Sequence, residues 1–261
     1  LWKTQRRYSM AQFFRKTASC STTSLNGVIT KGIAPFLLTV TSAAASHAGD
    51  TGALQAYTAK YQLTNGALAA TAERTLRKEG DHWRLSQNAS VLFLKVDEES
   101  LIEEVDGALR PLSYQYHNNL RSKSDQNFVF DWQAGRVSDK EARRPWEKAL
   151  KSGYQDQLSS QLALRHALIT GTFDESLEQT LVAKKGKIKT YSLTRLGEER
   201  LDTAIGALDT VKLHRQRPGS SSEATLWLAP SLNYMIVKME QIDDDERYTL
   251  ELLSVDLQGD N

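Results

Sequence analysis

Arg165 is the side chain whose type and position most clearly suggest chemistry in this sequence. Apolar residues recur with helical spacing around it, at Leu158, Leu162 and Ile169, so the arginine falls on or beside the face that should meet a sheet. A guanidinium near an apolar core must be paired or must reach water. Two interpretations follow: Asp156 or a strand carboxylate pairs with Arg165, or Arg165 binds the anionic head group of a ligand inside a barrel.

Aromatic residues on expected strands form the second group of candidates. A curved sheet lined by aromatic rings can enclose an apolar ligand, as small ligand-binding barrels do. The same rings could instead simply fill the core, and both interpretations stay open. The candidate ligand-binding residues beside Arg165 are Tyr57, Tyr61, Trp83, Trp132 and Trp227, with Tyr114, Phe128, Phe130 and Tyr234 in similar predicted positions.

Motifs of the familiar enzyme classes are missing from the sequence. It contains no Gly-x-Ser-x-Gly, no His-Glu-x-x-His and no glycine-rich phosphate loop with its lysine. The histidines after position 48 are scattered, and the acidic run 243–246 lacks the oxygen spacing of a calcium loop, so it is expected to be a hairpin tip. We therefore expect no catalytic residues, no metal and no cofactor. A glycan hydrolase using two carboxylates is a distant alternative, because no carboxylate pair is singled out by its context.

The N-terminal part of the chain differs sharply in composition from the rest. All six basic residues before position 49 occur without a single Asp or Glu, and a short apolar stretch, 32–41, is followed by small residues up to Ala48. These are the three parts of a secretory signal peptide, with cleavage expected after Ala48. Residues 1–48 are thus predicted to be a removable extension and signal, in which Leu1 to Ser9 precede a plausible start at Met10. The mature protein would be periplasmic.

The remaining residues, 49–261, have the composition of an exported globular protein. They carry 27 basic and 32 acidic residues, a net charge of −5, against +1 for the whole 261-residue chain, and no cysteine. Such a protein must be held by its core alone. The charge argues against nucleic-acid binding, and no apolar run after the signal is long enough for a transmembrane segment.

The elements that must position these residues are mainly strands. Asn65-Gly66 and Gly80-Asp81 predict tight turns between three consecutive strands, and 136–151 is expected to be a strand pair or a loop. One helix is predicted over 154–170, with Asp156 at its start and Gly171 at its end. We expect a single mainly β domain over 49–261, an antiparallel curled sheet or half-open barrel of about ten strands with one central helix packed against it. The predicted strands are 54–63, 67–77, 82–90, 109–117, 127–132, 179–183, 188–196, 208–215, 224–228, 234–242 and 247–257.

Three segments together resemble a known bacterial exported family, domain of unknown function 3108. The stretch 54–61 followed by Asn65-Gly66 resembles its opening strand, and Asp156-Gln157-Leu158-Ser159 with Leu164-Arg165 is similar to its helical motif. The segments 206–211, 227–230 and 233–238 resemble its C-terminal signature, with Ile236 where proline is expected. The resemblance covers about 54–257. It implies a mostly antiparallel β protein of the Gram-negative cell envelope and carries over no catalytic residue.

Two functions are compatible with these observations. The first is a non-enzymatic periplasmic binding or scaffolding module, whose ligand is a lipid or another apolar envelope molecule. Its shape class is similar to that of periplasmic lipoprotein carriers, which is an analogy of fold alone. The second is an interaction or assembly factor that meets another envelope protein through its outer face and edge strands and needs no cavity.

Overall fold

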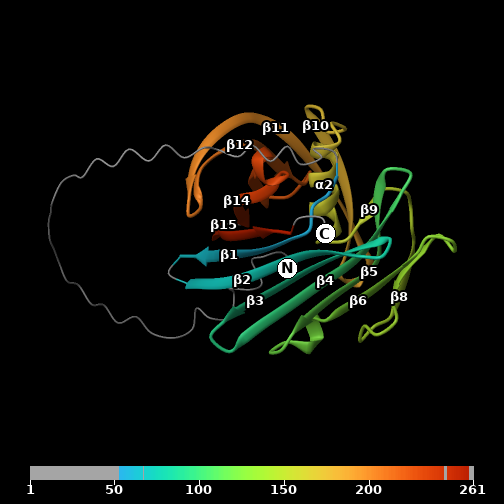
Figure 1. Cartoon of the computed structure of the whole chain (residues 1–261). Helices are drawn as coiled ribbons and strands as arrows, with labels where there is room; N and C mark the ends of the chain where they lie inside the picture. Colours follow the sequence, from blue (N-terminus) through green and yellow to red (C-terminus); the bar gives the residue numbers. More distant parts are fainter. Residues whose placement is uncertain (1–52, 67, 244–245, 259–261) are drawn as a thin grey trace, which may run out of the picture.

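The computed structural model describes residues 53–66, 68–243 and 246–258, which form a single curled sheet around one α-helix (Figure 1). The predicted signal and its cleavage site lie outside these residues. The sheet has 15 strands in the order β8-β7-β6-β5-β4-β3-β2-β1-β15-β14-β13-β12-β11-β10-β9. All pairs are antiparallel except β9 with β10. The mainly β class and the curled sheet are thus confirmed, but the expected number of about ten strands is wrong.

The strand order is that of a meander in which the first strand, β1, pairs with the last strand, β15. Strands β1 to β8 follow one another outward to one edge of the sheet, and the chain then crosses to the opposite edge at β9. Strands β9 to β15 follow one another back, and β15 pairs with β1 from Tyr57↔Leu257 to Thr64↔Thr249. The two free edges, β8 and β9, are therefore consecutive in sequence. The strands are β1 (Tyr57–Asn65), β2 (Leu68–Glu79), β3 (His82–Val91), β4 (Leu94–Val105), β5 (Ala108–Asn118), β6 (Gln126–Asp131), β7 (Arg136–Asp139), β8 (Trp146–Ala149), β9 (Tyr154–Gln155), β10 (Ser176–Ala183), β11 (Lys187–Thr203), β12 (Gly206–Gln216), β13 (Glu223–Ala229), β14 (Met235–Asp243) and β15 (Glu246–Leu257).

The first two predicted turns are confirmed. Gly66 and Gly80 have φ of +56° and +59° in the β1–β2 and β2–β3 turns, a backbone conformation that glycine adopts without strain. The segment 136–151 contains a strand pair, β7 and β8.

Strand β4 had no clear sequence signal. Its inward residues Leu94, Val96 and Ile102 are buried, but three successive acidic residues, 97–99, and a bulge after Leu101 interrupt the alternation. Its hairpin with β3 also turns through Leu92-Phe93, which contain none of the usual turn residues. The other strand without a sequence prediction is the two-residue edge strand β9.

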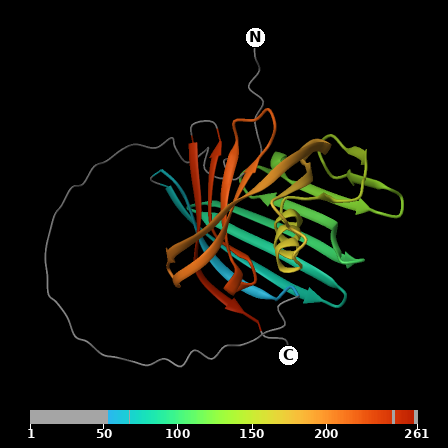
Figure 2. The ribbon, with the colours of Figure 1, turned by 90° about the horizontal axis from the view of Figure 1, so that it is seen from above.

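Helix α2 (Ser159–Ile169) lies inside the curl and connects the two halves of the sheet (Figure 2). It begins later than predicted because Tyr154–Gln155 forms β9. Asp156 still caps it, since its Oδ1 accepts the N–H groups of Leu158 at 2.8 Å and Ser159 at 2.9 Å. Gly171, with φ of +69°, follows the last turn, as expected.

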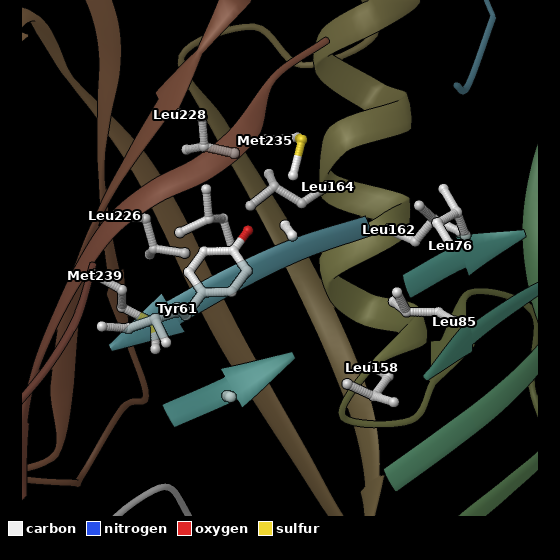
Figure 3. Close-up of a cluster of buried hydrophobic side chains, with 14 of the residues drawn as sticks. Tyr61, Leu76, Leu85, Leu158, Leu162, Leu164, Leu226, Leu228, Met235 and Met239 are labelled. Atoms are coloured by element: carbon white, nitrogen blue, oxygen red, sulfur yellow. The ribbon is translucent and has the colours of Figure 1, made fainter. Parts of the chain in front are cut away.

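The core surrounds α2 on more than one side. Leu158, Leu162 and Leu164 are almost wholly buried. Leu162 lies beside Leu76 of β2, whereas Leu164 points toward Met235 of β14 (Figure 3). Each buried leucine contributes about 1.5–3 kcal/mol of hydrophobic stabilisation. The helix therefore ties together the two halves of a sheet whose edges are not paired with each other.

Candidate functional site

A cavity of about 120 Å³ lies between the concave face of the sheet and the start of α2. An engineered cavity of about 150 Å³ holds a benzene-sized ligand, so this space fits a ring or a few methylene groups. Its apolar lining is Leu63, Ala89, Val96, Leu181, Val182 and Ala183. Its polar and aromatic lining is Arg74, Gln87, Glu98, Tyr114, Tyr116, Ser124, Gln126, Gln157, Gln161, Lys184, Lys189 and Tyr191.

Arg74 of β2 is the more deeply buried of two buried cations that line this cavity, the other being Lys184. Its Nη1 donates to Gln161 Oε1 of α2 at 3.0 Å, and its Nε donates to Gln87 Oε1 of β3 at 3.0 Å. The guanidinium also lies 5.3 Å from the centre of the Tyr61 ring. Only 4% of Arg74 is exposed, and no carboxylate among the described residues pairs with it directly. A buried guanidinium held by neutral amides keeps its positive charge available to an anionic group.

Glu98 of β4 stands beside this cation. Gln87 Nε2 donates to Glu98 Oε2 at 3.3 Å, and the Tyr114 hydroxyl donates to Glu98 Oε1 at 2.5 Å. Burial raises the pKa of the Glu98 carboxyl, while the Tyr114 hydrogen bond and the charge of Arg74 oppose that rise. The pKa of Tyr114 is raised by burial and by Glu98. The wall of the cavity therefore carries an arginine and a carboxylic acid linked through one glutamine.

Asp156 stabilises this wall of the cavity without lining the cavity itself. It is completely buried, and its Oδ2 accepts the Ser100 hydroxyl of β4 at 2.7 Å. Burial raises the pKa of Asp156 from its ordinary 3.8 to about 6, although its hydrogen bonds from Ser159, Ser100 and Leu158 favour the ionised form. Asp156 thus fastens the start of α2 to β4, the strand that carries Glu98.

Arg165 does not pair with Asp156 or with a strand carboxylate, so that expectation is wrong. Its Nε donates to the Asn233 carbonyl oxygen and its Nη2 donates to Asn233 Oδ1, each at 3.1 Å. The guanidinium lies 4.9 Å from the centre of the Tyr57 ring. Asp156 is occupied in capping the helix instead. Asn233 can reach Arg165 because its backbone turns with φ of +54°, a conformation that asparagine tolerates better than most residues.

A smaller pocket of about 10 Å³, room for one water-sized group, lies beside Arg165. Tyr57 and Tyr61 line it with Arg165 and Arg74, and Arg74 and Gln161 also line the larger cavity. Arg165 Nη1 is buried and has no hydrogen-bond partner among the described residues. Burial lowers the pKa of Arg165. Three of the predicted residues, Arg165, Tyr57 and Tyr61, therefore meet next to the cavity.

The three predicted tryptophans lie elsewhere. Trp83 is buried in the core, and Lys78 Nζ lies 5.1 Å from its ring centre. Trp132 donates its indole N–H to the Pro111 carbonyl oxygen at 2.7 Å. Trp227 is held between two lysines, and its N–H donates to Glu199 at 3.0 Å. None of the three lines the cavity or the smaller pocket.

Sequence reasoning missed Arg74, although a signal for it was present. Ala70, Ala72, Arg74 and Leu76 alternate along β2 and all face inward, so Arg74 is a charged residue in an inward register. Glu98 and Gln161 had no comparable signal, because β4 was not recognised and glutamine is common on helix surfaces.

Two further observations concern only the part of the chain that the structure describes. It contains no group of three or more His, Cys, Asp or Glu side chains arranged to hold a metal ion. It also contains no helix with the length and hydropathy of a membrane span.

Solved structures from three bacteria match this chain at low sequence identity. A β-barrel-like protein of domain of unknown function DUF1849 from Brucella abortus matches with a TM-score of 0.57 and 12% identity, over 79% of this chain and 99% of that chain. This likeness shows a shared β-barrel-like fold. MucB in the MucA/MucB complex of Pseudomonas aeruginosa has a TM-score of 0.33 and 13% identity, over 80% of this chain and 54% of that chain. A putative exported protein with a YmcC-like fold from Bacteroides fragilis has a TM-score of 0.32 and 10% identity, over 78% and 96% of the two chains.

No curated protein matches the sequence significantly. A family described as "Protein of unknown function (DUF3108)" matches residues 56–252, which span β1 to most of β15 and include the whole cavity lining. This match confirms the resemblance seen in the opening strand, the helix and the C-terminal strands. The chain therefore belongs to the DUF3108 family.

Proposed function

We propose that this protein is an exported, non-enzymatic binding protein of the bacterial envelope that holds one amphipathic ligand between its curled sheet and α2. The observation that carries the proposal is the cavity, with aliphatic side chains on one part of its wall and a buried cation on the other. Ligand pockets commonly combine an apolar lining with a few fixed polar groups in this way. The apolar part of the ligand would lie against Leu63, Val96 and Val182.

The charge of the site favours an anionic polar group on the ligand. Arg74 faces the cavity without an acidic hydrogen-bond partner, and Arg165 has an unsatisfied N–H on the adjoining pocket. An anionic oxygen at this position would satisfy a buried charged donor, which is costly to leave unpaired. The cavity volume of about 120 Å³ accommodates only a short apolar segment, so a longer chain would extend beyond it.

Calorimetric titration with sodium octanoate and with octanol tests this proposal. We expect both to bind, and octanoate to bind about tenfold more tightly because it adds one charge-assisted hydrogen bond. Ala183→Trp would fill the cavity and abolish binding of both compounds. Ala134→Trp, at an exposed turn, is the matched control and should bind as the wild type does. Binding of neither compound by the wild type, or equal binding by Ala183→Trp, would refute the proposal.

A second candidate function is assembly with another envelope protein. The observation that favours it is the pair of unpaired sheet edges at β8 and β9, because an exposed edge can accept a strand from a partner. Crosslinking in cells followed by affinity purification separates the two functions. A reproducible partner crosslinked to β8 or β9, together with no octanoate binding, would favour assembly over ligand binding.

A further inference from the structure

The β3–β4 hairpin turns through two bulky apolar residues that are fully accessible to solvent. Leu92 is 79% exposed and Phe93 is 84% exposed, at a two-residue turn closed by the pair Val91↔Leu94. Leu92 has φ of +51°, the left-handed region that is unfavourable for a branched side chain. The β1–β2, β2–β3, β4–β5, β6–β7 and β12–β13 turns each place a glycine at positive φ instead. This turn therefore has a common hairpin conformation but departs from the usual turn residues in both side-chain bulk and polarity.

A third exposed apolar residue extends the same surface. Leu120 is 58% exposed and lies in the loop after β5. The preceding residue, Asn119, donates from Nδ2 to the Phe93 carbonyl oxygen and accepts the Lys95 N–H at Oδ1, both at 2.9 Å. These bonds hold the loop against the hairpin. We call Leu92, Phe93 and Leu120 the apolar tip.

Three basic residues flank the apolar tip in the sequence. Lys95 follows the hairpin turn, and Arg121 and Lys123 follow Leu120. Lys95 and Lys123 are exposed, and Arg121 is half-buried. The nearest acidic residue on the loop, Asp125, is bonded to His117 at 2.9 Å and to the Asn118 N–H at 3.0 Å. Lys95, Arg121 and Lys123 outnumber by one charge the two acidic residues here, Asp125 and Asp97, of which Asp97 lines the same surface hollow as Lys95. The local charge is thus positive, although residues 49–261 as a whole have a net charge of −5.

Exposed strain that contributes nothing to the fold points to a function. Apolar side chains flanked by Lys and Arg are the combination that inserts into the interface of an anionic bilayer, because the rings and methyl groups enter the acyl boundary while the cations meet lipid phosphates. We infer that the apolar tip docks this protein onto the surface of an anionic lipid membrane.

The position of the tip relative to the cavity is consistent with this inference. Ala89 and Val96 pair across β3 and β4 and line the cavity, two residues from the ends of these strands at Val91 and Leu94. Two strand residues span about 7 Å. Docking would bring this end of the cavity close to the lipid surface, but the inference does not depend on a ligand being bound.

Vesicles of phosphatidylethanolamine and phosphatidylglycerol in a 7:3 ratio provide the test. All variants are made in the full chain, with N-terminal processing verified by intact mass so that it is identical in each. In a Cys20→Ser background, Phe93→Cys is labelled with the environment-sensitive fluorophore NBD. We expect a blue shift and a severalfold increase in emission on adding vesicles. The matched control is Ile205→Cys, at the exposed β11–β12 turn, whose label should keep its emission in buffer.

A double variant separates docking from folding. Leu92→Gly/Phe93→Ser replaces the apolar pair with favoured turn residues, so we expect its urea midpoint to be equal to or higher than that of the wild type. Its vesicle partitioning should fall by at least about tenfold. Lys95→Gln and Lys123→Gln should each lower partitioning about fivefold.

Three results would overturn the inference. The first is an NBD label at position 93 that stays in water when vesicles are present. The second is a double variant that partitions onto vesicles as the wild type does. The third is a change of oligomeric state in the double variant with unchanged vesicle binding, which would make the tip a contact between protein copies. Failure of octanoate binding would refute the proposed ligand function alone and leave this inference standing.

Discussion

Asp156 should make this protein less stable at neutral pH than in mild acid. Its pKa rises from an ordinary 3.8 to about 6 because the carboxyl is fully buried. Well below pH 3.8 the carboxyl is neutral in both the folded and the unfolded chain. As the pH rises, the unfolded chain ionises first, and above pH 6 the folded state bears the whole cost of a buried charge. A pKa raised from 3.8 to about 6 costs roughly 3 kcal/mol of stability in total, of which about 2 kcal/mol is lost between pH 4 and pH 7.5.

Asp156→Asn is the perturbation that isolates this contribution. The asparagine oxygen can still accept the N–H groups of Leu158 and Ser159, and its amide can donate to the Ser100 hydroxyl. Urea unfolding of both proteins at pH 4.0 and pH 7.5 gives four free energies of unfolding. We expect the loss of stability between the two pH values to be smaller in Asp156→Asn by about 2 kcal/mol.

Comparing the two pH differences removes the titration of every group that does not interact with Asp156. The charge of Asp156 contributes to the raised pKa of Glu98, so that part of the Glu98 effect belongs to the measured difference and acts in the same direction. Asp97→Asn, at an exposed carboxylate of β4, is the control and should retain the pH dependence of the wild type. This prediction is refuted if the loss of unfolding free energy between the two pH values differs between wild type and Asp156→Asn by less than about 0.5 kcal/mol, the usual size of non-additivity. A larger loss in Asp156→Asn than in the wild type would mean that the ionised Asp156 stabilises the fold, the opposite of this prediction.

Three further predictions concern the packing around α2 and the edges of the sheet. Leu162→Ala should lower the free energy of unfolding by about 2–5 kcal/mol, measured in urea, because its side chain is 1% exposed. Gly186→Ala should lower the thermal midpoint more than Gly219→Ala does: both have positive φ, but only the Cβ at position 186 would lie 2.7 Å from a ring carbon of Trp146. Asn233→Ala should lower the free energy of unfolding by about 1–3 kcal/mol, measured in urea, because the buried Nη2 of Arg165 loses its acceptor. Equal stability of the variant and the wild type would show that water replaces the amide oxygen.

Local signals in the sequence were sufficient for much of the architecture. Turns with glycine at positive φ and alternating strands predicted the β1–β2–β3 meander, and the helical spacing around Leu158 and Leu162 predicted α2 with Asp156 and Gly171 at its ends. These features depend on contacts between residues close in sequence. Strand β4 was missed because its alternation is interrupted by acidic residues, one of which, Glu98, faces the cavity.

The candidate site was predicted only in part. An arginine on the helix and tyrosines on the first strand were recognised, and the structure places Arg165, Tyr57 and Tyr61 around one small pocket. Their environment was not predictable, because Asn233, the partner of Arg165, lies 68 residues further along the chain. Arg74 was missed although its inward register was readable.

Residue type and spacing alone determined most of the strands, the helix, its caps and the presence of a buried arginine. Only the tertiary structure decided which half of the sheet contributes Arg74 and Glu98, that Asp156 serves α2 and Ser100 and does not pair with Arg165, and where the cavity lies. The physical reason is the joining of β1 to β15, which sets the curl of the whole sheet. That long-range pairing brings β2–β6 and β10–β11 to opposite walls of one space, and no local pattern encodes it.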